Sequence, residues 1–379
     1  MAEAVKIYDG AINKGLEGVV ACTTTISSII DATLCYRGYT IEDLAAHATF
    51  EEVSWLLWSG KLPTNAELTQ FKADLGKEMQ LPTDLVTQLK ELPTNTHPMA
   101  WLRTAVSMVG MWDSETEDMS DAANARKALR LTAKMGVLVA LFKRTREGQS
   151  FVAPKVGQSI AWNFLYMLDG KEPDAELVKT FDTCLVLHAD HELNCSAFAS
   201  RVTASSLSDM YSAVVSAIGA LKGPLHGGAN EQVMLMLKEI GSVDNVFPWL
   251  DQALAEKKKV MGFGHRVYKN GDPRAKILSQ MSEFLTKKAG HPQYYEMSKM
   301  LDDHMQSKKG LLPNVDFYSA TVYYSMGIPI DIYTPIFAVS RIAGWCAHIL
   351  EQYSNNRIYR PRGQWEGPTD LKYKSIELR

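Results

Sequence analysis

Apolar residues at helical spacing fill most of this chain from Thr40 onward, in segments that begin at a capping residue and end at glycine or proline. No strands alternate with these segments, which argues against a parallel sheet and predicts an all-α fold. Helices are expected over residues 50–58, 65–79, 82–91, 98–111, 121–147, 174–188, 194–205, 209–222, 273–289, 293–309 and 335–353, with one starting after Gly228 and one ending at Met326. A further helix is expected to start at Thr40, which with Asp43 resembles a capping pair before Leu44.

A single β-like region lies near the N-terminus, within residues 18–39. Val19–Ile26 and Leu34–Tyr36 are rich in β-branched and aromatic residues, with Asp31 and Ala32 between them. We expect a small N-terminal hairpin here. It is too short to be the sheet on which the fold is built.

Glycine, proline and charged residues become more frequent after Lys222. This change predicts a two-domain protein, because such punctuation marks breaks between helices. Residues 1–222 and 327–379 are expected to form a large helical domain, and residues 223–326 a small helical domain.

Composition narrows the class of partner and compartment. The net charge is −3 over 379 residues, so the chain is not a typical nucleic-acid binder. The apolar runs fall far short of the ~20 residues that a membrane span needs. Five cysteines without a C-x-x-C pair argue against a disulfide framework, and no signal peptide is seen, so we expect a cytoplasmic protein.

One histidine stands between a Gly-Pro break and a Gly-Gly pair, in Gly223-Pro-Leu-His226-Gly-Gly. The residues after Gly228 read as a new helix, which places His226 near a helix N-terminus. The positive end of a helix favours a neutral imidazole and nearby anions. A neutral imidazole in a cleft is the commonest acid–base group, so His226 is a candidate catalytic residue.

Three further polar clusters could carry chemistry. Gly262-Phe-Gly-His265-Arg places an imidazole and a guanidinium in a glycine-containing loop, although a simple exposed turn has the same composition. Asp316 is flanked by Val, Phe and Tyr, so burial would raise its pKa and make it a better base, whereas the alternative is a helix N-cap. The third cluster, His188-Ala-Asp190-His191-Glu192, leaves two interpretations open: a metal site or a polar helix C-terminus. Its histidines are three apart, not the four of the zincin pattern, so we expect no metal.

Arginines complete the set. Arg341 lies in an otherwise apolar stretch, where a charge must find an anion or pay for its desolvation. Arg274, Arg360 and Arg362 follow proline- or asparagine-containing turns, and arginine is well suited to gripping carboxylates with two hydrogen bonds. Together with the histidines and Asp316, these residues suit a dicarboxylate substrate and proton abstraction next to a carbonyl.

The four clusters, in this order and spacing, resemble the citrate synthase family. The similarity runs from Gly18 through Tyr36-Arg-Gly-Tyr39 to Arg-Pro-Arg362, and so covers nearly the whole chain. It implies a two-domain all-α homodimer of the short type, without an extra N-terminal β domain. It also implies condensation of acetyl-CoA with oxaloacetate and hydrolysis of the thioester, with no permanently bound cofactor and the coenzyme A thioester as co-substrate.

The resemblance also implies roles for individual residues. Asp316 matches the base that removes the acetyl proton, His226 the group that binds the thioester oxygen, and His265 the group that polarises and protonates the oxaloacetate carbonyl. The oxaloacetate ligands match His191, Arg274, Arg341 and Arg360, the last reaching in from the partner subunit. The coenzyme A loop matches Lys259, Val260, Met261, Gly262 and Phe263.

Three alternatives remain at this stage. A 2-methylcitrate synthase using propionyl-CoA shares the motifs, and one methylene is worth only ~1–3 kcal/mol of discrimination. A metal-dependent hydrolase would use His188, Asp190, His191 and Glu192. A non-enzymatic helical scaffold would leave Asp316, His226 and His265 without a role.

Overall fold

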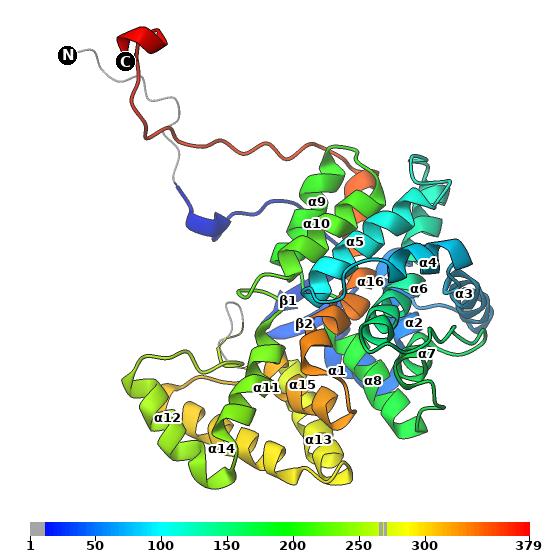
Figure 1. The fold of residues 1–379 in the computed structure, drawn as a ribbon, viewed down its shortest axis with the longest axis vertical. Coiled ribbons are helices and arrows are strands. Elements are labelled where there is room, and N and C mark those ends of the chain that lie inside the picture. Colours follow the sequence, from blue (N-terminus) through cyan, green and yellow to red (C-terminus); the bar gives the residue numbers. More distant parts are fainter. Residues whose placement is uncertain (1–11, 265–267, 269–270) are drawn as a thin grey trace. The chain divides into compact units, whose positions relative to one another are not determined.

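The computed structural model describes residues 12–264, 268 and 271–379. They divide into a main unit, Thr24–Arg357, and a terminal unit that joins the described residues up to Thr23 with Ile358–Arg379. The main unit is built of helices and one small three-stranded sheet (Figure 1). The predicted all-α class with a small hairpin is therefore confirmed.

The helices of the main unit follow the predicted segments closely. Their bounds are α1 Ile41–His47, α2 Phe50–Ser59, α3 Asn65–Glu78, α4 Thr83–Lys90, α5 Pro98–Met111, α6 Asp121–Arg146, α7 Ile160–Asp169, α8 Ala175–His188, α9 Cys195–Ser205, α10 Met210–Leu221, α11 Ala229–Ile240, α12 Val246–Ala255, α13 Pro273–Lys288, α14 Pro292–Lys309, α15 Val315–Ser325 and α16 Tyr333–Ser354.

Two of these helices, α7 and α12, were not predicted. Helix α7 was missed although its signals are present: Ser159 caps it by accepting from the Trp162 N–H at 3.1 Å, and Trp162 and Tyr166, one helical turn apart, are the partly exposed positions among the otherwise buried residues 160–168. Helix α12 contains Pro248, which reads as a breaker in the sequence. Proline is tolerated there because it lies in the first turn, where no intrahelical N–H bond is lost.

The hairpin forms later in the chain than predicted. Its strands are β1 Ser27–Ile30 and β2 Thr33–Tyr36, followed by a short β3 Tyr39–Thr40, all antiparallel. The turn between β1 and β2 is the predicted pair Asp31 and Ala32, both at positive φ as a tight hairpin turn requires. This turn fixes which residues pair, so the strand before it is Ser27–Ile30. The expected strand Val19–Ile26 was therefore wrong.

Helix α16 is the centre of the main unit. It packs against α2, α5, α6, α8, α9, α10 and α11, and its residues from Tyr333 to Ile349 are buried (Figure 1). Because so many helices contact it, α16 holds in place both Arg341 and the turn that carries His188 and His191.

Helices α11 to α15 form a second group within the main unit. In this group α13 packs against α14 and α15, α11 against α15, and α12 against α14 (Figure 1). The group falls in residues 223–326, which the sequence assigns to a small domain. Residues 24–357 form one compact unit, so that division stays a prediction.

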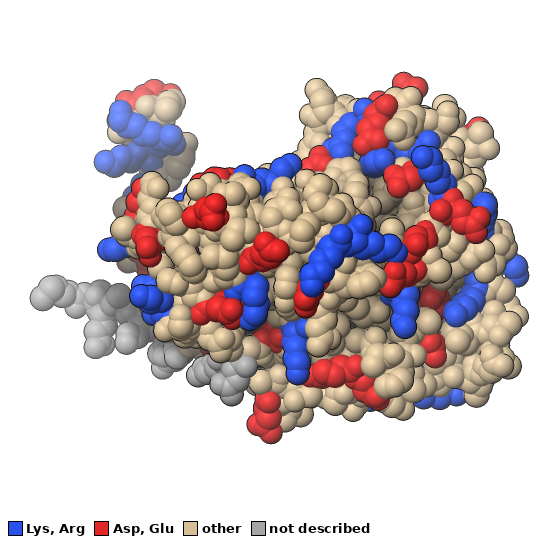
Figure 2. Space-filling model, turned by 90° about the horizontal axis from the view of Figure 1, so that it is seen from below, with Lys and Arg blue, Asp and Glu red and all other residues tan. Residues whose placement is uncertain are grey.

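The length of the helices and the charge on the surface bear on whether a membrane or a polyanion could be a partner. No helix in the described part of the chain is long and apolar enough to cross a membrane. On the face shown in Figure 2, acidic and basic side chains are interspersed. A polyanion would therefore find no large basic area on this face.

Candidate active site

A tight turn between α10 and α11 carries His226. The Gly227 N–H donates to the Leu221 carbonyl at 3.0 Å, and the His226 N–H donates to the Gly223 carbonyl at 2.9 Å. A Cβ at position 227 would lie 2.6 Å from Leu221 Cδ1 and 2.7 Å from its carbonyl oxygen. Glycine is therefore required at 227 for the chain to fold back and turn His226 toward α9.

The ring of His226 faces the N-terminus of α9. Its Nε2 lies 3.2 Å from the Ser196 amide nitrogen and 2.8 Å from Ser196 Oγ. An amide N–H can only donate, so Nε2 holds a lone pair and the proton of the neutral ring is on Nδ1. Burial, with a smaller contribution from Arg341, lowers the pKa of His226 to about 4. The predicted neutral imidazole is present, but the helix N-terminus it faces is that of α9 and not that of α11.

Ser196 is held in turn by α16. The indole N–H of Trp345 donates to Ser196 Oγ at 3.0 Å, and both side chains are buried. The Asn194 side chain caps α9 by accepting from the Ala197 N–H at 3.1 Å. Ser196, whose amide fixes the tautomer of His226, is therefore held both by α16 and by the capped start of α9.

The turn after α8 is docked onto α16. Arg341 Nε donates to the His188 carbonyl at 2.7 Å, and the Gly344 N–H donates to the Ala189 carbonyl at 3.1 Å. A Cβ on Gly344 would lie 2.4 Å from both the Ala189 carbonyl oxygen and Asp190 Oδ1. Only glycine permits this close approach, which fixes the His188–His191 turn relative to Arg341.

His188 is buried at the end of α8. Its Nδ1 lies 2.8 Å from the Cys184 carbonyl, so Nδ1 carries the proton and Nε2 is a lone pair. Nε2 has no hydrogen-bond partner among the described residues. Burial and the neighbouring charge of Arg274 lower the pKa of His188 to about 3, so this ring is neutral at physiological pH.

Asp190 is the end of a buried chain of polar groups. Arg201 Nε donates to His348 Nδ1 at 3.0 Å, which leaves the proton of a neutral His348 on Nε2, 3.3 Å from Asp190 Oδ2. Ser27 Oγ donates to the same carboxylate. Burial alone would raise the pKa of Asp190, but His348, Arg341 and Ser27 outweigh it, and the pKa falls below its usual value.

His191 is half-buried and contacts Tyr268. Its Nε2 lies 3.1 Å from the Tyr268 hydroxyl, and the two rings meet edge to face with centroids 5.4 Å apart. Tyr268 is buried, so it joins the His191 turn to the segment that leads to Arg274.

Arg341 is a buried cation. Its side chain is 2% exposed, its guanidinium lies over the Phe337 ring at 4.7 Å, and it forms no ion pair with a carboxylate among the described residues. Burial lowers the pKa of Arg341 to about 10, with Asp190 opposing the shift. A buried guanidinium without an ion-pair partner is well suited to an anionic ligand.

Arg274 has a partner of its own. Its Nε and NH2 donate to Asp272 at 2.9 and 2.7 Å, in the fork geometry typical of an arginine and a carboxylate. Asp272 also accepts from the Val315 N–H at 3.1 Å, so it joins the N-termini of α13 and α15. Burial would lower the pKa of Arg274, but Asp272 outweighs it and raises the pKa above its usual value. Arg274 is therefore held rigidly beside the helix that begins at Val315.

Asp316 lies in the first turn of that helix and is buried. Asn314 supplies the N-cap, so Asp316 is not the cap that the sequence offered as an alternative. Burial raises the pKa of Asp316 to about 7, although Arg274 and Arg341 pull it down. Its Oδ1 has no hydrogen-bond partner among the described residues. A carboxyl with a pKa near 7 and a free oxygen has the properties of a general base.

These charge effects identify the residues that the fold brings together. Arg341 acts on His226, His188 and Asp316, and Arg274 acts on His188 and Asp316. These five side chains therefore lie in one electrostatic neighbourhood. Ser196 and Asp272 belong to it through the hydrogen bonds above, and Tyr268 through its electrostatic interaction with Arg274, although sequence analysis had given none of them a role.

The roles of two predicted site residues stay predictions. His265 lies outside the described residues. Arg360 is exposed in the terminal unit, and its role across a subunit interface stays a prediction. Of the predicted coenzyme A loop, Lys259 is exposed, whereas Val260, Gly262 and Phe263 are buried.

The proposed metal ligands do not converge. His188 bonds to a carbonyl, Asp190 to Ser27 and His348, and His191 to Tyr268. Among the described residues, no group of three or more His, Cys, Asp and Glu could hold a metal ion. His188, Asp190 and His191 each have a protein partner of their own.

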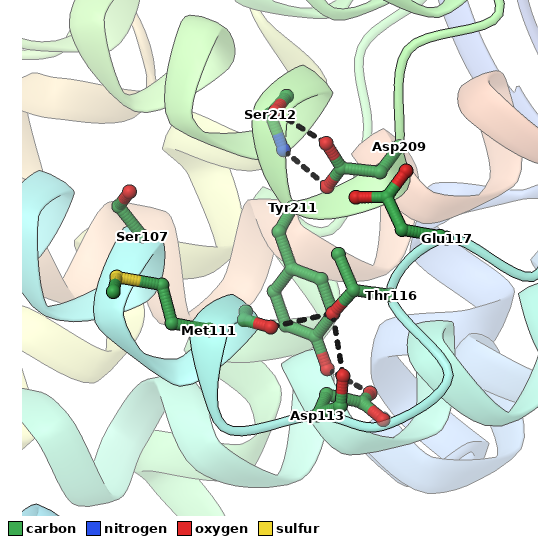
Figure 3. Close-up of a pocket in the computed structure, with 9 residues that line it drawn as sticks. Ser107, Met111, Asp113, Thr116, Glu117, Asp209, Tyr211 and Ser212 are labelled. Carbon is green, nitrogen blue, oxygen red and sulfur yellow. Dashed lines mark hydrogen bonds between the residues drawn. The ribbon is translucent and has the colours of Figure 1, made fainter.

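A pocket of about 380 Å³ lies elsewhere, between the end of α5, the loop after it and the start of α10 (Figure 3). Asp113, Glu117 and Asp209 are among its lining residues, and the lining contains no basic residue. Tyr211 points its hydroxyl at Asp113 and donates to it at 2.5 Å. Because its charges are acidic, this pocket would repel a dicarboxylate.

Comparison with known proteins agrees with this geometry. The family model described as "Citrate synthase, C-terminal domain" matches residues 15–362. Citrate synthase 2 of Bacillus subtilis is 55% identical, with 97% of this chain and 99% of the relative covered. A 2-methylcitrate synthase of Mycobacterium tuberculosis is 44% identical, with 94% and 91% covered.

Solved structures show the same fold. Citrate synthase from Pyrobaculum aerophilum superposes with a TM-score of 0.91 at 42% identity, covering 97% of this chain and 95% of its own. The Thermoplasma acidophilum citrate synthase, solved as a ternary complex with carboxymethyl coenzyme A and oxaloacetate, has a TM-score of 0.92 at 35% identity, covering 97% and 99%. The family resemblance found in the sequence motifs is confirmed: this chain belongs to the citrate synthase family.

Proposed function

We propose that this enzyme is a transferase that condenses acetyl-CoA with oxaloacetate and water to give citrate and coenzyme A. The observation that carries the proposal is Asp316, a buried carboxyl with a pKa raised to about 7 and an unpartnered oxygen, beside two buried arginines and a neutral histidine. This combination supplies a base, an anion site and a neutral donor, which are the three requirements of the reaction.

The first step is removal of a proton from the acetyl methyl group by Asp316. The electron pair of that C–H bond moves toward the thioester oxygen, which the Nδ1–H of His226 stabilises by a hydrogen bond. Neutral His226 is a suitable donor because its Nε2 is already occupied by the Ser196 N–H. The geometry of α9 thus supports this role for His226.

In the second step the new nucleophilic carbon forms a bond to the carbonyl carbon of oxaloacetate. The carbonyl oxygen takes a proton from His265, whose role rests on its sequence motif. Arg341, Arg274 and His191 hold the two carboxylates, with Arg360 supplied by a second subunit. Water then cleaves the thioester of citryl-CoA, releasing citrate and the thiol.

The choice of acyl-CoA is the least constrained part of the proposal. The two relatives compared above favour acetyl-CoA first, since a citrate synthase matches at 55% and a 2-methylcitrate synthase at 44%. A propionyl group adds one methylene, which is worth ~1–3 kcal/mol of discrimination at most sites. We therefore propose citrate synthase activity first, with 2-methylcitrate synthase activity as the second candidate.

Assembly as a homodimer of a large and a small domain is the quaternary and domain arrangement that we propose. The terminal unit carries apolar side chains that are exposed within it, among them Trp365 at 61%, Leu371 at 77% and Tyr373 at 84%. A partner subunit would cover such groups. The five free cysteines support a reducing cytoplasmic compartment.

One assay tests the function. Release of free thiol is followed with oxaloacetate and either acetyl-CoA or propionyl-CoA, and kcat/KM is compared for the two. We expect activity with both and a preference for acetyl-CoA. A preference for propionyl-CoA above roughly a hundredfold would replace the first candidate with the second. No thiol release with either would refute both.

A further inference from the structure

One side chain joins the predicted coenzyme A loop to the catalytic helix. The amide of Asn314 donates from Nδ2 to the Gly264 carbonyl at 3.0 Å, and its Oδ1 accepts from the Asp316 N–H at 3.1 Å. The backbone N–H of Asn314 donates to the Gly262 carbonyl at 2.9 Å. A single residue therefore makes two bonds to residues 262–264 and one to the backbone of Asp316.

The surrounding contacts make this connection stiff. The Gly264 N–H donates to the Leu312 carbonyl at 3.0 Å, and Phe263 and Pro313 form an antiparallel bridge. The Phe263 ring lies 4.5 Å, centroid to centroid, from the Phe317 ring in the first turn of α15. The loop cannot shift without moving the start of that helix.

Gly262 makes the close packing possible. It has φ of +82°, and a Cβ there would lie 2.7 Å from Phe317 Cδ2 and 2.8 Å from Val233 Cγ2. A larger residue would push the loop away from α11 and α15 together. The loop is therefore seated directly on the helix that carries Asp316.

We propose that Asn314 is a positioning residue that couples the seating of the acyl-CoA to the placement of the Asp316 carboxylate. The inference rests on the proposed function, because that function assigns residues 259–263 to coenzyme A and Asp316 to proton removal. The base must lie at hydrogen-bonding distance from the acyl α-carbon, and a misplacement of about 1 Å costs on the order of a hundredfold in rate. A thioester held by one end of this connection is thereby aligned with the base at the other end.

A substitution can separate the two roles of the Asn314 side chain, which are to cap α15 and to bind the Gly264 carbonyl. Asn314→Ser keeps a hydroxyl that can accept from the Asp316 N–H, but its short side chain cannot reach the Gly264 carbonyl. We expect the KM for acetyl-CoA to rise at least fivefold and kcat to fall about tenfold, with the KM for oxaloacetate unchanged within twofold. Hydrogen exchange at the Gly264 amide should also become faster.

A control and a second variant make the test decisive. Thr64→Ala removes an N-cap from α3, far from these residues in the sequence, and should lower Tm without changing either KM. If Asn314→Ser does not fold, Asn314→Asp takes its place, since it keeps the cap and the size but has no donor for Gly264. Equal changes in both KM values, or no change in the KM for acetyl-CoA, would overturn the inference. Absence of thiol release by the unmodified enzyme would instead refute the proposed function.

Discussion

The Ser196 amide N–H donates to Nε2 of His226 across 3.2 Å, and this contact determines which nitrogen of the imidazole can serve a substrate. Nδ1 carries the proton and is the atom left to donate. The pKa of His226 is lowered to about 4 by burial, with Arg341 adding to the shift. A neutral donor of fixed orientation avoids competing with Asp316 for a proton.

Nitrogen NMR of the histidines tests this assignment. Between pH 5.5 and 8, His226 should show the tautomer protonated at Nδ1 and no titration, with protonation only as the pH approaches 4. His226→Ala should lower kcat by about 10²–10³-fold, the cost typical of losing one oxyanion donor. A titration midpoint above pH 6 would contradict the lowered pKa on which the role of a neutral donor depends.

Asp316 should control the pH dependence of the reaction. The group must be ionised to accept a proton, and burial raises its pKa to about 7 in the free protein. The kcat/KM for acetyl-CoA should therefore increase with pH through about 7 and then level off. Asp316→Asn should reduce it by about 10²–10⁴-fold and leave the KM for oxaloacetate close to its original value.

The same substitution should change stability in a pH-dependent way. A carboxyl whose folded pKa is raised stabilises the protein fully below its unfolded pKa of 3.8, and that contribution is lost as pH rises through about 7. Asp316→Asn should thus gain stability over the natural protein at pH 8 more than at pH 5, by several degrees in Tm. The same Tm difference at both pH values would contradict a raised pKa.

Removing the buried Arg201 should lower the free energy of unfolding far more than removing the exposed Lys299. Its guanidinium is 2% exposed and contacts His348, Gln352 and Glu351. Arg201→Met would leave these groups buried without their donor, at a cost of about 3–5 kcal/mol in the free energy of unfolding. Lys299→Met, which breaks an exposed pair with Asp303, should cost less than about 1 kcal/mol. Urea unfolding measures both, and equal effects would mean that the buried chain contributes nothing specific.

Gly344→Ala should displace the His188–His191 turn. The added Cβ would meet the Ala189 carbonyl oxygen at 2.4 Å, so we expect a loss of about 1–3 kcal/mol and a higher KM for oxaloacetate. Gly219→Ala is the matched control in α10, where a Cβ meets nothing within 4 Å. That variant should gain up to about 1 kcal/mol from helix propensity. If the two variants behave alike in urea unfolding and steady-state kinetics, the close approach of α16 to the turn is unimportant.

Local pattern predicted most helices because caps and breakers act within a few residues. Helix α2 begins at Thr49 with a capping box and ends at Gly60 in the left-handed region, and both features are legible in the sequence. The hairpin was placed too early because β-branched composition does not set the register, whereas the turn at Asp31 and Ala32 does. Helix α7 was missed although its N-cap Ser159 and its C-cap Gly170 are of the kind that marks helix ends in a sequence.

The site shows the same division between local and distant information. His226, Asp316, Arg274 and Arg341 stood out by their unusual surroundings in the chain. Ser196 did not, because its importance depends on a histidine 30 positions later folding back onto α9. Asp272 did not stand out either, since its bond to the Val315 N–H spans 43 positions.

The sequence by itself determined the helical class, the helix ends and the set of acid, base and cationic side chains. These follow from propensities and periodicity, which act over a few residues. Only the tertiary structure decided the protonation of His226 and the pKa of Asp316. It also decided that Arg274 pairs with Asp272, whereas Arg341 has no ion-pair partner among the described residues. Burial and neighbouring charges set these properties, and both come from helices far apart in the chain.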